Sequence, residues 1–186
     1  MSSLMAALAG LALQAAPLDD LYKFKAETAW TYKRIEDGVE RKISARSLGE
    51  ESGKVRVDWK EYRKDGELHK ASVLTWCIDD GALTCTAKSK TDDGQDEELS
   101  FSVLKDGAKK DDTWQSALGQ MAHRGTLDVT VPAGTYKNAV QTRLGLGEDG
   151  HIDFFLVPKV GLAKIVLIQQ GKETQSWELT EFKPAK

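Results

Sequence analysis

The chain has 186 residues, of which 40% are hydrophobic and 30% are charged, so it can bury one sizeable core but hardly two. We therefore expect a single domain. The formal net charge is -3, and because acidic and basic residues are mixed along the whole chain, no basic face can follow phosphates and we expect no nucleic-acid partner.

An apolar run over Leu4–Leu13 opens the chain and indicates export. It is too short to cross a hydrocarbon core of about 30 Å but has the length of the apolar part of a signal peptide. Because Pro17 directly after a cut would hinder cleavage, we predict a signal peptide over residues 1–15 and one β-rich domain over residues 16–186. The first three residues carry no positive charge, which leaves a buried N-terminal helix as the alternative. We expect a periplasmic or secreted protein without an integral membrane segment.

Beyond this segment, apolar and polar residues alternate with a period of two, which is typical of half-buried strands. Val55, Val57 and Trp59, for example, alternate with charged residues. Turn signals separate such runs, at Asp37-Gly38, Asp65-Gly66, Asp80-Gly81, Asp93-Gly94, Asp106-Gly107, Asp149-Gly150 and Gly171-Lys172. We predict an all-β protein in which about ten strands form one strongly curved antiparallel sheet, as a partial or open β-barrel.

Two segments are candidates for short helices, Leu18–Phe24 and Thr113–Met121. Neither is long enough to cover a face of such a sheet, so the sheet is expected to coil around its own apolar face. The charged segment Lys109–Asp112 is interpreted as a solvated connection between two halves of the sheet.

The two cysteines, Cys77 and Cys85, flank a predicted hairpin turn. A turn centred on Gly81 would place the sulfurs on facing positions of adjacent strands, within disulfide reach in an oxidising compartment. We predict a Cys77–Cys85 disulfide. Two reduced, buried thiols are the alternative, and a zinc site with His69 is disfavoured because two cysteines are too few ligands.

Signals for catalysis are weak. Ser116 lacks the first Gly of a nucleophile elbow, and His69, His123 and His151 have no metal-ligand spacing among them. On a strand, His151 and Asp153 would share a face, as an acid-base pair or metal site requires, but a hairpin turn is the favoured interpretation.

An acidic run over residues 92–98 clusters five carboxylates. It lacks the ligand spacing of an EF-hand loop and is interpreted as an acidic hairpin tip rather than a calcium site. We expect no enzyme activity, no catalytic residues, no metal and no cofactor.

Two Pro-containing turns carry the most informative pattern. In the sequence Val-Pro-Ala-Gly-Thr-Tyr, Pro132 presets a turn and Gly134 supplies a positive φ. A second turn follows Pro158, and the next strand begins at Gly161. We expect both glycines to be needed for their backbone conformations.

These turns, with Val157–Lys164, the closing Trp177–Phe182 and an early Trp30–Tyr32 strand, resemble an exported bacterial family of largely unknown function with a curved β-sheet domain. The resemblance covers nearly all of residues 16–186, with Tyr136 and Ala163 as departures from the pattern. The family is similar in architecture to periplasmic lipoprotein carriers of the LolA/LolB-like type, whose half-barrel holds acyl chains on its concave face. For function, this implies only a fold-level analogy.

We therefore expect a non-enzymatic binding or carrier protein that holds a lipid or other apolar ligand on the concave face of the sheet. Large aromatic residues on alternating positions are the candidate ligand-binding residues, at Trp30, Trp59, Phe101 and Trp177. The alternative is a structural or interaction module of the cell envelope, with a filled core and a protein partner. A continuous apolar cavity of a few hundred Å³ would favour the carrier.

Overall fold

The computed structural model describes residues 17–90 and 94–186, so the predicted signal peptide and part of the acidic run lie outside the described residues. The described part holds one short helix, α1 (Asp19–Tyr22), and a single sheet of twelve strands. The strands are β1 (Ala29–Glu36), β2 (Val39–Glu51), β3 (Lys54–Tyr62), β4 (Leu68–Asp79), β5 (Ala82–Lys90), β6 (Asp96–Lys105), β7 (Thr113–Ser116), β8 (Gly119–Val131), β9 (Gly134–Gly145), β10 (Gly150–Val157), β11 (Gly161–Gln169) and β12 (Lys172–Lys183). None of the helical residues in this part is in a helix that could cross a bilayer.

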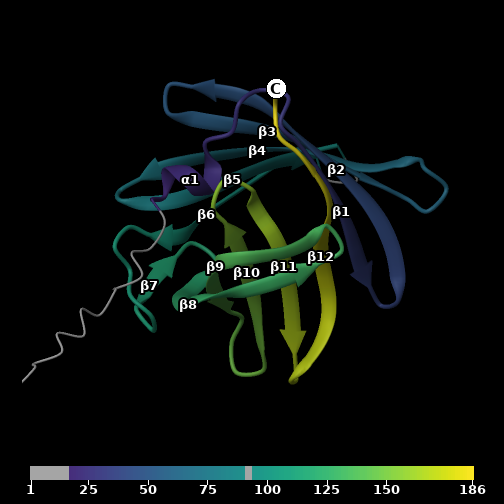
Figure 1. Cartoon of the computed structure of the whole chain (residues 1–186). Coiled ribbons are helices and arrows are strands. Elements are labelled where there is room, and N and C mark those ends of the chain that lie inside the picture. The colour runs from purple at the N-terminus through teal and green to yellow at the C-terminus, as the bar shows by residue number, and fades with distance from the viewer. Residues whose placement is uncertain (1–16, 91–93) are drawn as a thin grey trace, which may run out of the picture.

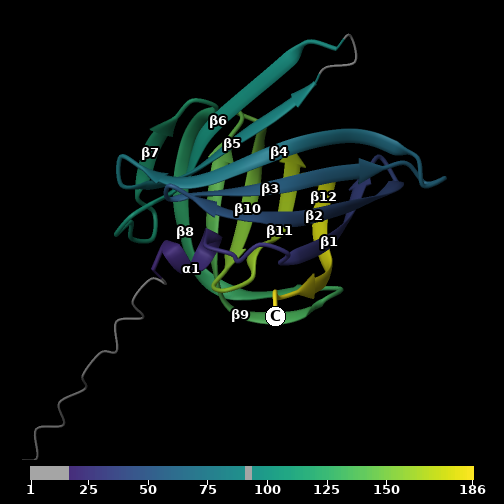
Figure 2. The same ribbon diagram turned by 90° about the horizontal axis from the view of Figure 1, so that it is seen from above.

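All neighbouring strands run antiparallel, in the order β6-β5-β4-β3-β2-β1-β12-β11-β10-β9-β8-β7. The chain passes by hairpins from β1 to one edge at β6, crosses to the other edge at β7, and returns by hairpins to β12 beside β1. The sheet coils until its edges approach each other (Figures 1 and 2). There the indole Nε1 of Trp114 on β7 donates a hydrogen bond of 3.0 Å to Ser102 Oγ on β6.

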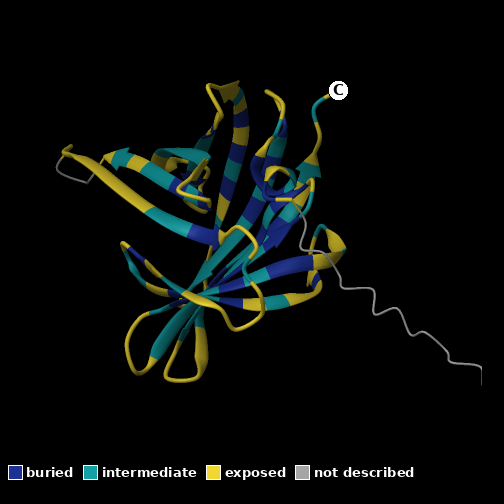
Figure 3. Cartoon of the chain, turned by 90° about the vertical axis from the view of Figure 1, so that its left-hand side faces the viewer, coloured by how far each residue is buried: buried dark blue, intermediate teal, exposed yellow. Residues whose placement is uncertain are grey.

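The predicted all-β class and curved antiparallel sheet are confirmed, and Lys109–Asp112 is part of the connection between the two edge strands. Alternate side chains point into the coil, where they form the core. Val55 and Val57, for example, are 0% and 5% exposed. Buried residues lie along the middle of the strands, and exposed ones gather at the hairpin ends (Figure 3).

One of the two predicted helices is present. The helix α1 lies within Leu18–Phe24 and buries Leu21 and Tyr22. The predicted helix over Thr113–Met121 is wrong, because this segment forms β7, a tight turn and the start of β8. Trp114 faces Met121 across that hairpin. Packing of these two side chains on one face of a strand pair outweighs the local helical pattern.

The predicted Cys77–Cys85 disulfide is also wrong, since both residues are free thiols. The hairpin turns through two residues with positive φ, Asp80 and Gly81, and the resulting register places Cys85 opposite Trp76. Cys77 is therefore offset by one residue from the position that faces Cys85. Because successive side chains point to opposite faces, the two sulfurs lie on opposite sides of the sheet.

We expect both thiols to react with a thiol reagent in denaturant, but Cys85 to be protected in the folded protein at pH 8. Burial raises the pKa of the Cys85 thiol to about 12, and the thiolate is the reactive form. Cys77 is only partly buried and should react first. Thiol counting before and after unfolding checks this, with Cys85→Ser as the control that removes the protected thiol. If no thiol reacted in denaturant, the two cysteines would be joined by a disulfide after all.

Candidate ligand-binding cleft

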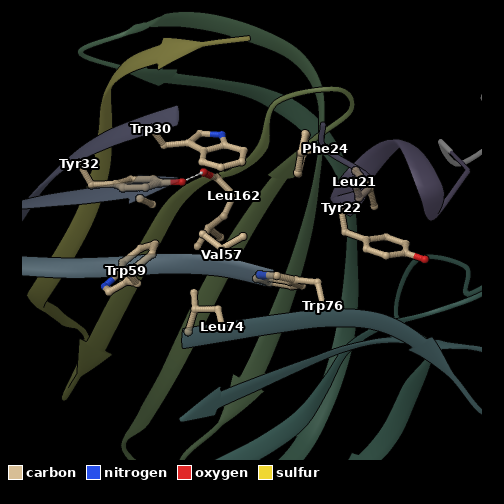
Figure 4. Close-up of a pocket in the computed structure, with 11 residues that line it drawn as sticks. Leu21, Tyr22, Phe24, Trp30, Tyr32, Val57, Trp59, Leu74, Trp76 and Leu162 are labelled. Atoms are coloured by element: carbon tan, nitrogen blue, oxygen red, sulfur yellow. Dashed lines mark hydrogen bonds between the residues drawn. The ribbon is translucent and has the colours of Figure 1, made fainter. Parts of the chain in front are cut away.

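An aromatic cleft lies on the concave face of the sheet, where β1 to β4 meet the segment around α1 (Figure 4). Its lining is apolar except for the hydroxyls of two tyrosines and the N–H groups of three tryptophans. The lining residues are Leu21, Tyr22, Phe24, Trp30, Tyr32, Ala45, Val57, Trp59, Leu74, Trp76 and Leu162.

Ring contacts build the wall of the cleft. The rings of Tyr32 and Trp59 lie 5.1 Å apart between centroids, although β1 and β3 are separated by β2. Phe24 packs edge-on against Trp30 with centroids 5.0 Å apart. Such pairs contribute about 0.5 to 1.5 kcal/mol beyond the area they bury. The cleft is therefore held by contacts between residues that are distant in the sequence.

Hydrogen bonds fix two of these rings. The indole Nε1 of Trp30 donates a hydrogen bond of 2.7 Å to the carbonyl oxygen of Val160. The hydroxyl of Tyr32 donates one of 2.8 Å to the carbonyl oxygen of Leu162. Burial raises the pKa of Tyr32 well above its usual value, because a buried phenolate would lose its hydration. The hydroxyl thus stays a neutral donor, and the rings present apolar surface to the cleft.

The free space in the cleft is small. Its cavity volume is about 30 Å³, which is room for about two water molecules. Leu21, Tyr22 and Phe24, from α1 and the residues after it, form one side of the cleft (Figure 4). The backbone N–H of Lys159 donates to the carbonyl oxygen of Asp20 at 2.6 Å and ties this segment to the β10–β11 turn. The segment around α1 thus fills space that the sheet alone would leave open.

The apolar surface continues from the cleft onto the splayed strands β4 to β6. Leu74, which lines the cleft, is in register with Ala87 and then with Leu99 across this part of the sheet. Leu99 is 42% exposed. Phe101, two residues further on β6, lies with its ring centroid 5.9 Å from that of Phe154 on β10. The strip therefore leads from solvent to the interior.

Two of the four predicted ligand-binding residues, Trp30 and Trp59, line the cleft. Phe101 packs against the core further along the same concave face. Trp177 on β12 is opposite Arg34 in the register, and its ring lies 4.9 Å from the Arg34 guanidinium carbon. The structure thus brings two of the four residues together and places the other two along the inner wall.

Sequence reasoning missed a charged cluster next to the cleft, formed by Arg34, Arg41, Glu36 and Glu61. Arg34 Nη1 donates to both carboxylate oxygens of Glu61, at 3.0 and 3.1 Å, and its Nη2 lies 2.9 Å from Glu36 Oε1. Arg41 Nη1 bonds to Glu61 at 3.1 Å and to Glu36 at 3.2 Å. The side chain of Glu61 is only 8% exposed and that of Arg34 17%.

Other sequence candidates form no site with the expected chemistry. Asp153 accepts hydrogen bonds from Arg143 Nε at 2.7 Å and from Gln141 at 3.0 Å, and the former raises the pKa of Arg143. The favoured hairpin turn at His151 and Asp153 is wrong, because both lie on β10, where they share a face with His151 Nε2 3.8 Å from Asp153. Among residues 17–90 and 94–186, no three His, Cys, Asp or Glu side chains gather as a metal site.

Comparison with known proteins finds a likeness in the fold but none in the sequence. No family model and no curated protein matches the sequence. Solved structures do match the fold, among them two crystal structures of bacterial proteins. One is described as a "putative lipoprotein" from Parabacteroides distasonis, with a TM-score of 0.60 and 14% identity over 88% of this chain and 98% of that chain. The other is described as a "putative exported protein with YmcC-like fold" from Bacteroides fragilis, with a TM-score of 0.56, 12% identity and the same coverages. At these identities the likeness concerns the fold alone.

Proposed function

We propose that the protein is an exported, non-enzymatic binding or carrier protein that holds an apolar, lipid-like ligand on the concave face of its sheet. The observation that carries the proposal is the aromatic cleft and its continuation to the exposed Leu99. An apolar strip that runs from solvent into a cleft gives an apolar chain a path along which it stays shielded from water.

A ligand of acyl-chain size needs more than the 30 Å³ now free. The segment around α1 is the part of the lining that can give way, because a four-residue helix has little stability of its own. If Leu21 and Phe24 leave the cleft, their volume becomes available to the ligand. Binding would then exchange one set of apolar contacts for another.

Export is supported by the apolar run over Leu4–Leu13 and by the words "lipoprotein" and "exported" in the descriptions of the two structures with this fold. An apolar ligand in a bacterial envelope is most commonly an acyl chain. The proposed ligand class is therefore lipid.

A second candidate function is an interaction module with no small-molecule ligand. It is favoured by the small volume of the cleft, since the core as a whole is packed. The edge strand β6 is a poor surface for strand pairing with a partner, because Asp96, Glu97 and Glu98 at its start are charged and exposed. Charged edge residues are a common protection against such pairing.

Native mass spectrometry of protein purified without detergent, followed by organic extraction, separates the two functions. A carrier retains lipid or takes up added phospholipid, with a blue shift of emission from the Trp residues in the cleft. If the protein retains no lipid, takes up no phospholipid and shows no shift of Trp emission, the interaction module is the remaining function.

Within the carrier function, we expect Trp59→Leu to weaken binding of an apolar fluorescent probe by roughly tenfold. Loss of the ring forfeits about 1 to 2 kcal/mol of apolar and aromatic contact. Tyr62→Leu is the matched control, because Tyr62 lies on the same strand but outside the cleft. Fluorescence titration measures both affinities. Equal affinities for the two variants would place the probe elsewhere.

A further inference from the structure

The charged cluster adjoins the aromatic cleft on the same inner face of the sheet. Arg34 follows Tyr32 by two residues on β1, and Glu61 follows Trp59 by two residues on β3. Residues two apart on a strand share a face and lie about 7 Å from each other. Resting on the proposed function, we propose that the ligand is an uncharged acyl ester, with its hydrocarbon chain in the cleft and its carbonyl oxygen at Arg34.

The first argument is an open hydrogen-bond donor. Nε of Arg34 is buried and has no hydrogen-bond partner among the residues that the structure describes. The other two nitrogens of Arg34 are occupied, Nη1 by Glu61, and Nη2 by Glu36 and by Gln175 Oε1 at 3.2 Å. A buried donor without an acceptor is destabilising, because it has given up its hydrogen bond to water. A carbonyl oxygen at this position would remove this destabilisation.

The second argument is the balance of charge. The cluster holds two arginines and two glutamates, so its formal charges cancel. A further cation on this face, Lys70, is opposite Glu61 on β4, but it is 47% exposed and lies 3.9 Å from Glu97. A buried carboxylate head group would therefore lose its hydration without gaining a free counter-charge.

The open donor and the balanced charges together favour one class of apolar ligand over two others. A free fatty acid brings an anion that the cluster cannot neutralise, whereas a hydrocarbon alone leaves Nε of Arg34 without an acceptor. An ester supplies a neutral acceptor and an apolar chain. The ring of Trp177, 4.9 Å from the guanidinium carbon, adds a contact that helps to hold Arg34 in place.

The test compares methyl decanoate with decanoate at pH 8, below the concentration at which either aggregates, by displacement of an apolar fluorescent probe. We expect the ester to bind on the order of tenfold more tightly than the carboxylate, because the cluster has no free cation to offset a buried anion. Arg34→Lys keeps the positive charge but removes Nε, and should weaken binding of the ester on the order of tenfold, as loss of one hydrogen bond to a charged donor implies. Arg124→Lys is the matched control, because Arg124 pairs with Asp111 at the surface.

A second variant keeps the test decisive if Arg34→Lys does not fold. Glu36 is 26% exposed, and Glu36→Gln gives the cluster one surplus positive charge. This change should raise the affinity for decanoate on the order of tenfold while leaving that for the ester nearly unchanged.

The outcomes separate the two proposals. If the wild-type protein binds neither compound, the carrier function fails. If it binds both equally, binds decanoate more tightly, keeps the wild-type affinity for the ester in Arg34→Lys, or gains no affinity for decanoate in Glu36→Gln, the carrier function stands but the ester assignment is overturned.

Discussion

Replacing Glu61 by Ala should lower the free energy of unfolding by about 3 kcal/mol or more. The carboxylate is 8% exposed and accepts hydrogen bonds from Arg34 and Arg41. Its removal leaves two partly buried guanidinium groups without that partner, and breaking a buried ion pair by removing one partner typically costs about 3 to 5 kcal/mol. We expect a loss of stability at the lower end of this range, because Arg41 is 26% exposed and can reach water. Urea unfolding at pH 7 measures the change.

Glu97→Ala is the control for this prediction. Glu97 pairs with Lys70 at 3.9 Å, and its side chain is 57% exposed, so its loss should cost less than about 1 kcal/mol. A double substitution of Arg34 and Glu61 by Met and Leu should recover part of the stability lost in Glu61→Ala, since apolar residues can replace a buried pair. Similar losses for Glu61→Ala and Glu97→Ala would mean that water screens the cluster as well as it screens the surface.

The sheet could be predicted from the sequence because its signals are local. Alternation places Val55, Val57 and Trp59 on the inner face whatever the partner strands are, and Asp-Gly pairs mark the hairpin turns. The cysteine pairing failed because it depends on register. Whether the turn has two residues or is centred on Gly81 decides whether the two sulfurs lie on the same face of the sheet or on opposite faces.

The cleft was predicted in part for the same reason. Trp30 and Trp59 are inward positions of alternating strands, but the contribution of α1 depends on where a short helix packs, which no local pattern gives. The same alternation places Tyr32, Arg34 and Glu36 on one face of β1 and could have drawn attention to inward charges. Their partner Glu61 lies two strands away, so the cluster appears only when the sheet is assembled.

Gly161→Val should destabilise the protein strongly, because two separate costs act at this position. The backbone has φ of +88°, a region that β-branched residues rarely adopt, which costs about 1 to 3 kcal/mol. In addition, an ideal Cβ at residue 161 would lie 2.9 Å from Cζ of Phe24. Val therefore requires that Phe24 move, and with it one side of the aromatic cleft. Urea unfolding should show a loss larger than strain alone would give.

Gly134→Val isolates the conformational part of this loss. Gly134 also has a positive φ, of +139°, but nothing lies within 4 Å of the position that its Cβ would take. The Gly134→Val variant should therefore lose less stability than the Gly161→Val variant. Phe24→Ala in the Gly161→Val background should recover the steric part, so the two changes are expected to cost less together than the sum of their separate costs. Additive costs would show that the residue 161 side chain does not meet Phe24, and that the segment around α1 is not held against the β10–β11 turn in solution.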